Sequence, residues 1–185
     1  MKAIEYLWIF ASLTLTLPLC AQTFDADTKA EGIVVTHSDK LSGAIDVNKD
    51  LNQVLLTQGN SLKIISARDI KEVLIDGKLT YKGYELDDKF YLMEVIAYGH
   101  ITIYYKEGIE KDTYTHKQYS GYFFEKNGKI REVEGKKDFL GLFGNDEKWM
   151  SLRIKNQGFD LNKKQDVQAA FLYYNQSFEV TNPSP

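Results

Sequence analysis

Cysteine is almost absent from this chain of 185 residues, in which Cys20 is the only one. Cys20 lies in an N-terminal stretch that we expect to be removed, so residues 22–185 have no thiol and can form no disulfide. Cysteine can therefore serve neither as a nucleophile nor as a metal ligand in the mature chain. The fold must be stabilised by the burial of apolar side chains alone.

Histidine is also scarce, and the three histidines are His37, His100 and His116. They fall at or near three different expected turns, and none has another histidine or a cysteine at metal-ligand spacing. We expect no bound metal and no cofactor. The chain also lacks the G-x-S-x-G motif of a nucleophile elbow and the G-x-x-x-x-G-K-S/T motif of a phosphate-binding loop.

An excess of charge of either sign is missing as well. The chain has 23 lysine and arginine residues against 26 aspartate and glutamate residues, for a formal net charge of -3. A nearly neutral chain lacks the positive electrostatic footprint of a nucleic-acid-binding protein. We therefore expect no nucleic-acid partner.

The N-terminus has the pattern of a secretory signal peptide. Lys2 supplies a positive charge, residues 7–19 are apolar, and Ala21 provides a small residue before a cleavage site. We predict a signal peptide over residues 1–21 and export to the periplasm or the extracellular space.

Two other interpretations of this segment compete with the first. A membrane anchor needs about 20 apolar residues, whereas this run is shorter and contains Pro18, so we expect no transmembrane segment in the mature chain. A lipoprotein would be acylated at Cys20. Leu19 stands where lipoprotein signals place a small residue, so lipid anchoring is the less favoured alternative.

The longest β-prone run after this leader is FYLMEVIAYGHITIYYK, residues 90–106. We predict two strands that turn at residues 98–100. In the first strand the alternate residues Met93, Val95 and Ala97 share one face. In the second strand the alternate residues Ile101, Ile103 and Tyr105 share one face. This period of two is typical of a half-buried strand pair, and we expect the rest of the sheet to form around it.

Turn residues divide the neighbouring segments into further hairpins. We predict strands over residues 32–36, 41–47, 53–57, 62–66, 72–75, 79–86, 119–126 and 129–133. The strongest turn signal is Asn127-Gly128, because both residues tolerate a positive φ angle. Residues 66–69 are expected to form one capped helical turn that Ile70 holds to the core, and residues 107–118 a long hairpin tip.

After Gly135 the period of the apolar residues changes from that of strands to that of helices. Asp138, Asp146 and Asn162 can each cap a helix, which predicts helices over residues 138–143 and 147–156 and a third after Asn162. One apolar stripe is expected along the third helix, formed by Val167, Ala170, Phe171, Tyr174 and Phe178.

Strands that come first and helices that come last predict an α+β fold. We expect a bent antiparallel sheet or partial β-barrel of hairpins, followed by a short C-terminal helical segment. The predicted parts are the signal peptide (1–21), a flexible lead-in (22–31), an antiparallel β domain (32–135), helices packed on the sheet (136–180) and a tail (181–185).

Oxygen ligands at alternate positions, as at the start of a calcium-binding loop, are provided by Asp46, Asn48 and Asp50. Such a loop also needs glycine at its sixth position and glutamate at its twelfth, where this chain has Leu51 and Thr57. We interpret the segment as a polar connection between strands.

Several of these segments follow one another in a familiar order. They are the opening hairpin GIVVTHSDKLSGAI, the Ser-x-x-Asp-Ile turn at residues 66–70, the central hairpin that turns at glycine, and the Lys-Lys-Asp-Phe-Leu helix start at residues 136–140. Over residues 32–175 this order resembles a group of uncharacterised small secreted proteins of the Bacteroidetes kind. The resemblance implies an envelope or secreted location and a sheet followed by helices, and it carries over no catalytic residue.

Tyrosine is the residue type that stands out. Nine tyrosines cluster in the middle strands: Tyr81, Tyr84, Tyr91, Tyr98, Tyr104, Tyr105, Tyr114, Tyr119 and Tyr122. An aromatic face with polar tips suits sugar rings or a protein partner, although tyrosine also favours strands for structural reasons. The expected ligand site is one face of one strand, formed by Tyr98, His100, Thr102 and Tyr104.

We therefore predict a secreted or periplasmic, non-catalytic binding module of the cell envelope, whose partner is an envelope protein or a saccharide. The first alternative is a carboxylate-dependent hydrolase, for which Glu94 is the candidate, unless Glu94 is simply a polar residue on a solvated sheet face. The second is a structural envelope component that docks through its C-terminal helices and exposes an apolar patch at Phe171 and Tyr174.

Overall fold

The computed structural model describes residues 30–181 except residues 113 and 127, and of residues 179–181 it describes the backbone alone. The predicted signal peptide, most of the predicted lead-in, and residues 182–185 lie outside the described residues. No helix in the described part of the chain is long and apolar enough to cross a membrane.

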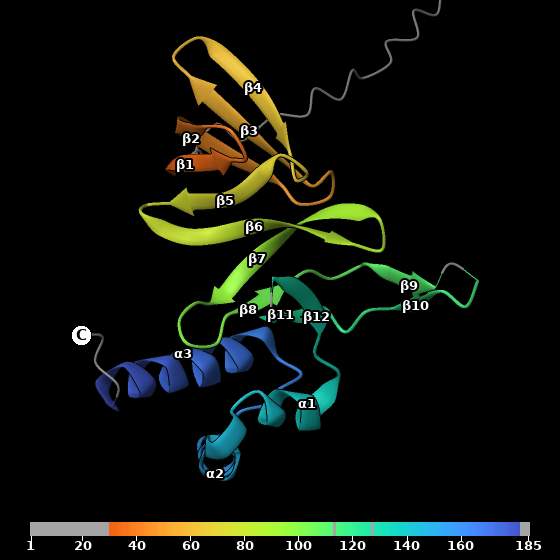
Figure 1. Ribbon diagram of the computed structural model, residues 1–185, viewed down its shortest axis with the longest axis vertical. Helices are drawn as coiled ribbons and strands as arrows, with labels where there is room; N and C mark the ends of the chain where they lie inside the picture. The colour runs from red at the N-terminus through yellow and green to blue at the C-terminus, as the bar shows by residue number, and fades with distance from the viewer. Residues whose placement is uncertain (1–29, 113, 127, 182–185) are drawn as a thin grey trace, which may run out of the picture.

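Ten strands form one antiparallel sheet that does not close, in the order β12-β11-β8-β7-β6-β5-β1-β2-β3-β4 (Figure 1). Their bounds are β1 Ala30–Thr36, β2 Lys40–Asn48, β3 Gln53–Gln58, β4 Ser61–Ser66, β5 Ile70–Ile75, β6 Lys78–Leu86, β7 Lys89–Ala97, β8 Ile103–Tyr105, β11 Tyr122–Lys126 and β12 Lys129–Glu132. A second sheet pairs β9 (Glu110–Asp112) with β10 (Lys117–Gln118).

The helices follow the last strand. They are α1 (Gly135–Gly141), the 3-10 turn η2 (Gly144–Asp146), α2 (Glu147–Gln157) and α3 (Lys164–Thr181). In Figure 1, β1 to β4 lie at one end of the molecule and the helices at the other, with β7 between them. The predicted α+β class, an antiparallel sheet followed by a short C-terminal helical segment, is confirmed. The prediction left a bent sheet and a partial barrel open, and the observed sheet does not close.

The predicted hairpins are present. The two-residue turn between β3 and β4 uses Gly59 at a φ angle of 56°, and the β5–β6 turn uses Asp76 and Gly77 at 50° and 75°. These left-handed values match the right-handed twist of the flanking strands. Gly128 also has a positive φ angle, 72°, whereas Asn127 lies outside the described residues.

The central strand β7 differs from its prediction, because it is buried on both faces. Leu92 and Met93 are neighbours and both are almost inaccessible, as are Ile96 and Ala97. The register of β7 against β8 shifts between Val95 and Ala97, so alternation breaks at that point. The expected half-buried pair is therefore wrong: β7 carries core residues on each face.

Three clusters of buried side chains surround this strand. One fills the bend of the sheet between β1 and β7 and includes Val34, Val54, Leu56, Val73 and Leu92. A second lies under the helices and includes Ile96, Ile103, Phe139, Met150 and Phe171. The third is smaller and joins Met93, Tyr104, Ile109 and Phe123. Strand β7 contributes to all three, which explains why it has no solvated face.

The apolar stripe predicted for α3 is confirmed, since Val167, Ala170, Phe171 and Tyr174 are all buried. The predicted caps are only partly correct. Asp138 lies inside α1 and accepts a hydrogen bond from the Glu134 N–H at 2.9 Å. Asp146 precedes α2 but makes no capping hydrogen bond, because its carboxylate accepts one from the Tyr174 hydroxyl at 3.0 Å.

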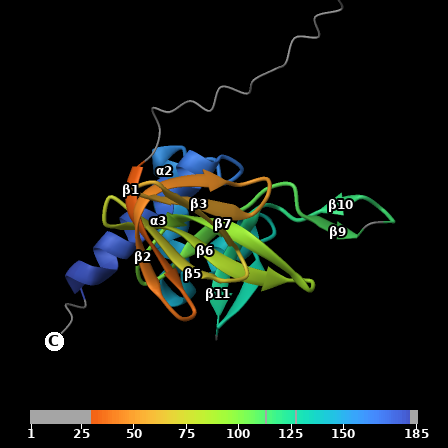
Figure 2. The ribbon, with the colours of Figure 1, turned by 90° about the horizontal axis from the view of Figure 1, so that it is seen from above.

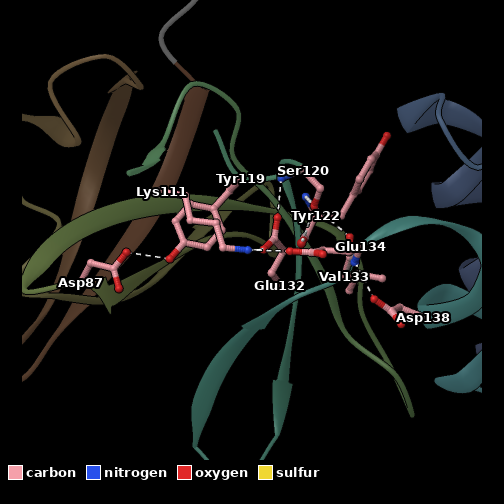
Figure 3. A network of polar contacts seen from close by, with 9 residues as sticks. All are labelled: Asp87, Lys111, Tyr119, Ser120, Tyr122, Glu132, Val133, Glu134 and Asp138. Atoms are coloured by element: carbon pink, nitrogen blue, oxygen red, sulfur yellow. Dashed lines mark hydrogen bonds and ion pairs between the residues drawn. The ribbon is translucent and has the colours of Figure 1, made fainter. Parts of the chain in front are cut away.

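The predicted long tip at residues 107–118 contains the β9–β10 arm, which projects from the body of the molecule (Figure 2). At its base the Lys111 ammonium lies 2.6 Å from a Glu132 oxygen and 2.5 Å from a Glu134 oxygen (Figure 3). Tyr119 donates a hydrogen bond of 2.6 Å to Asp87 in the β6–β7 turn. The arm is thus attached to β12 and to the sheet.

The loop between β7 and β8 is held by one buried polar residue of α3. Asn175 is 2% exposed; its amide group donates to the Ile101 carbonyl at 2.8 Å and accepts from the Ile101 N–H at 2.9 Å. Gly99 has a φ angle of 151°, and a Cβ atom there would lie 2.7 Å from the Asn175 side chain. The loop and the helix therefore fit closely only with glycine at this position.

We expect Asn175→Ala to destabilise the protein by roughly 2–4 kcal/mol, because the Ile101 N–H and carbonyl would lose their partners. Urea denaturation monitored by circular dichroism measures this change. Gln176→Ala, at the exposed neighbouring position, is the matched control and should change stability by less than about 0.5 kcal/mol. Equal effects of the two substitutions would contradict the role of Asn175.

Candidate functional site

A groove of about 650 Å³ lies between the β5–β6 hairpin, the end of β7 and helix α3. We call it the Tyr98 groove. Its lining residues are Glu72, Leu74, Gly77, Lys78, Leu79, Val95, Ile96, Tyr98, Gln168 and Leu172. A volume of this size lies within the range of about 300–1,000 Å³ that is usual for small-molecule sites.

The groove has an apolar floor because of how the sheet and the helix meet. Val95 and Ile96 lie near the end of β7, where Ile96 belongs to the cluster under the helices. Leu74 and Leu79 continue the apolar lining along the β5–β6 hairpin. Helix α3 supplies the opposite wall with Gln168 and Leu172. These positions are four residues apart, so they lie on the same face of the helix.

Tyr98 stands at the groove in the loop after β7, which lies beside α3 (Figure 1). It is 64% exposed, and the helix residue Leu172 is 38% exposed. The loop that carries Tyr98 is fixed through Gly99, Ile101 and Asn175. An exposed aromatic ring on a fixed loop can present a flat apolar surface with little loss of conformational entropy.

The four residues predicted as the ligand site do not form one exposed face. The His100 ring stacks on Phe178 of α3, with ring centroids 3.5 Å apart. The Thr102 hydroxyl lies 3.5 Å from the Gly99 carbonyl oxygen and thus stays within the loop. Tyr104 is 1% exposed on β8. Of the four, Tyr98 is the one that lines the groove.

Tyr104 is buried because its hydroxyl has partners inside the fold. The hydroxyl lies 2.9 Å from that of Tyr84 and 3.2 Å from a Glu125 oxygen, and Tyr84 donates to the same carboxylate at 2.6 Å. Burial raises the pKa of both tyrosines. The hydrogen bond from Tyr84 lowers the pKa of Glu125. The expectation that Tyr104 faces outward beside Thr102 is therefore wrong.

Glu94 is the candidate catalytic residue of the hydrolase alternative, but it is not among the residues that line the Tyr98 groove. Its carboxylate binds two lysines. Its carboxylate is 2.6 Å from the Lys164 ammonium and 3.2 Å from that of Lys49. Burial acts to raise the pKa of Glu94, but the hydrogen bond and charge of Lys164, together with Lys49, outweigh it and lower the pKa. Glu94 is thus held ionised, which does not suit a general acid.

The segment 46–50 also serves the fold. The Asn48 side-chain oxygen accepts a hydrogen bond from the Leu51 N–H at 2.9 Å, and the Lys49 carbonyl accepts one from Lys106 at 2.5 Å. Among the described residues no group of three histidine, aspartate or glutamate side chains is arranged to hold a metal ion. These contacts support the interpretation of the segment as a polar connection.

The Tyr98 groove combines apolar side chains with a few polar ones. Among the described residues that line it, the polar side chains are Glu72, Lys78, Gln168 and Tyr98, and the others are apolar or glycine. This set can accept and donate hydrogen bonds around an apolar surface. It has a single carboxylate and no histidine, so it lacks the acid–base pair that hydrolysis of a glycosidic bond requires.

Sequence reasoning missed the walls of the groove. Gln168 and Leu172 lie on α3 about 70 residues after Tyr98, and no local spacing connects them. One signal was available: Leu172 interrupts the polar face of a helix whose apolar stripe runs through Val167, Ala170 and Phe171. Single exposed apolar residues are common on protein surfaces, so Leu172 alone does not identify a groove.

No model of a known protein family, no curated protein and no solved structure matches this chain.

We expect Glu94→Gln to lower the free energy of unfolding at pH 7 by roughly 1–2 kcal/mol, because a neutral amide loses the attraction of two ammonium groups. A carboxyl whose pKa is depressed by folding adds stability above its unfolded pKa of about 4.3, and this stability is lost as the pH falls through the lower folded pKa. The difference between the proteins should therefore shrink below pH 4.

Urea denaturation at pH 7 and at pH 3 checks this expectation. Glu85→Gln, which removes a charge from an exposed position on β6, controls for the change in net charge. A Glu94→Gln effect that is the same at both pH values would show that the ion pairs are not its cause.

Proposed function

We propose that this protein is an exported, non-catalytic binding module of the cell envelope that holds a saccharide in the Tyr98 groove. The observation that carries the proposal is the exposed ring of Tyr98, fixed beside an apolar floor with polar groups at its rim. Sugar rings present one apolar face and a border of hydroxyl groups. Such a ligand can stack on Tyr98 while Glu72, Lys78 and Gln168 bind its hydroxyls.

Binding is favoured over hydrolysis by the placement of the carboxylates. Glu94 is held ionised by Lys49 and Lys164, and Glu72 has no second acid beside it among the described residues of the groove. A retaining or inverting glycosidase places two carboxyl groups about 5–10 Å apart around the scissile bond. The groove therefore supports recognition without cleavage.

Docking through an apolar patch at Phe171 and Tyr174 is not supported. Phe171 is 0% exposed and Tyr174 is 4% exposed, because both side chains fill the core between the helices and the sheet. The expected patch is therefore wrong, and the structural alternative loses the surface on which it depended.

Export and an envelope location are proposed from the expected signal peptide and from the resemblance to secreted proteins of the Bacteroidetes kind.

A thermal-shift screen of oligosaccharides and cell-wall fragments tests the proposal, followed by calorimetry on the saccharides that bind. A ligand at about 100 times its dissociation constant adds roughly 2.7 kcal/mol to the free energy of unfolding, which is a clear rise in melting temperature. Tyr98→Ala should weaken binding by roughly 2- to 13-fold, the loss expected from one aromatic contact.

The matched control is Tyr114→Ala, because Tyr114 is 97% exposed on the β9–β10 arm and does not line the groove. This variant should bind as tightly as the unchanged protein. Gln168→Ala should weaken binding. Catalytic turnover of the bound saccharide by the unchanged protein would refute the non-catalytic assignment. If no saccharide raises the melting temperature, the ligand class proposed for the groove is wrong.

A further inference from the structure

One edge of the ten-stranded sheet is exposed and apolar. Strand β4 is the terminal strand beside β3, and on it Leu62 and Ile64 are 58% and 61% exposed. The opposite edge, β12, carries the charged residues Lys129, Arg131 and Glu132. Proteins commonly place charges on edge strands to prevent unwanted pairing. Strand β4 has only Lys63 for this purpose.

The free backbone groups of β4 can be identified from its register. The two-residue turn makes Gln58 and Ser61 a hydrogen-bonded pair, and bonded and non-bonded pairs then alternate along an antiparallel ladder. The Ala67 N–H bonds to the Asn52 carbonyl at 2.8 Å, as this alternation requires. The N–H and carbonyl groups of Leu62 and Ile64 therefore point away from β3.

A hollow beside this edge offers room for apolar side chains. It has a volume of about 580 Å³. Val47, Leu51, Leu55 and Ile64 contribute its apolar lining, and the other lining residues are polar ones of the segment 46–53. Leu55 is paired with Ile64 across β3 and β4, and Leu51 is 64% exposed. A side chain placed opposite Ile64 by a further strand would lie on the same face as this hollow.

We infer that β4 accepts an added antiparallel strand from a partner protein, with apolar residues opposite Leu62 and Ile64 and an acidic residue opposite Lys63. Lys63 forms no ion pair with any residue in the described part of the chain. Asp39 and Asp69 line a small cleft with it but do not pair with it. Strand addition satisfies the free backbone groups, and side chains at alternate positions provide the specificity.

A second copy of this chain fits the edge less well. Antiparallel pairing of Leu62 with Ile64 of another copy places Lys63 opposite Lys63, and like charges directly opposite each other are destabilising. A shifted register places Ile64 of one copy opposite Ile64 of the other. This register requires the N–H and carbonyl groups of Ser66 that point away from β3. The Ser66 carbonyl already accepts a hydrogen bond from the Asp69 N–H at 2.9 Å. The charge at the centre of the edge thus favours an acidic partner strand.

Two capped synthetic peptides, STVEVTS and STVKVTS, test the inference. The first should bind the unchanged protein roughly 2- to 30-fold more tightly than the second, as expected for an opposite-charge pair replaced by a like-charge pair. In the Lys63→Glu variant the preference should reverse. Lys71→Glu, which makes the same change of charge at an exposed position on β5, should keep the preference of the unchanged protein.

Amide hydrogen exchange measured by NMR provides a readout that depends on strand addition itself. The acidic peptide at about 1 mM should slow exchange at Leu62 and Ile64 by at least threefold, whereas the Lys63 and Ile65 amides already bond to β3 and should change much less. The inference fails if neither peptide slows these two amides, or if both peptides bind equally. A dimer seen by ultracentrifugation and abolished by Ile64→Asp would also overturn it, because the occupant would then be a second copy.

Discussion

The carboxylate of Glu94 connects three separate parts of the fold through its ion pairs with Lys49 and Lys164. Lys49 lies in the β2–β3 connection, Glu94 on the central strand and Lys164 at the start of α3, so one carboxylate links the bend of the sheet to the helices. Placing a carboxylate in a partly buried position costs several kcal/mol unless it is paired. Here two ammonium groups share it, and the Lys164 ammonium also lies 4.8 Å from the centroid of the Tyr105 ring.

Local patterns predicted most of the fold, because turns and strands are local properties. Spacing and turn chemistry predict the hairpins, the apolar stripe of α3 and the antiparallel pairing of the sheet, but they leave open whether the sheet is a bent sheet or a partial barrel. The burial of β7 did not, since it depends on which elements cover each face. Leu92 contacts the sheet core, Met93 lies in the cluster with Tyr104, and Ile96 lies under the helices. A periodicity of two identifies a strand, but it cannot show that helices far along the chain cover the second face.

Of the four residues predicted to form the ligand site, Tyr98 lines the groove and the other three do not, for a shared physical reason. The prediction that one face holds all four residues assumes regular alternation through the turn. These residues are Tyr98, His100, Thr102 and Tyr104. The chain instead leaves the strand after Ala97, and β8 begins at Ile103. Tyr104 then points to Tyr84 and Glu125, which lie 20 and 21 residues away in sequence. A hydroxyl that bonds to side chains of other strands looks the same in the sequence as one that bonds to water.

Helix α3 is fixed on both sides of the residues that line the Tyr98 groove. Its first residue, Lys164, binds Glu94, and Asn175 binds the loop after β7 through both backbone groups of Ile101. These two attachments lie about 16 Å apart along a helix that rises about 1.5 Å per residue, and Gln168 and Leu172 lie between them. The wall of the groove is therefore set before any ligand arrives. A preformed wall reduces the ordering cost of the binding that we propose for this groove.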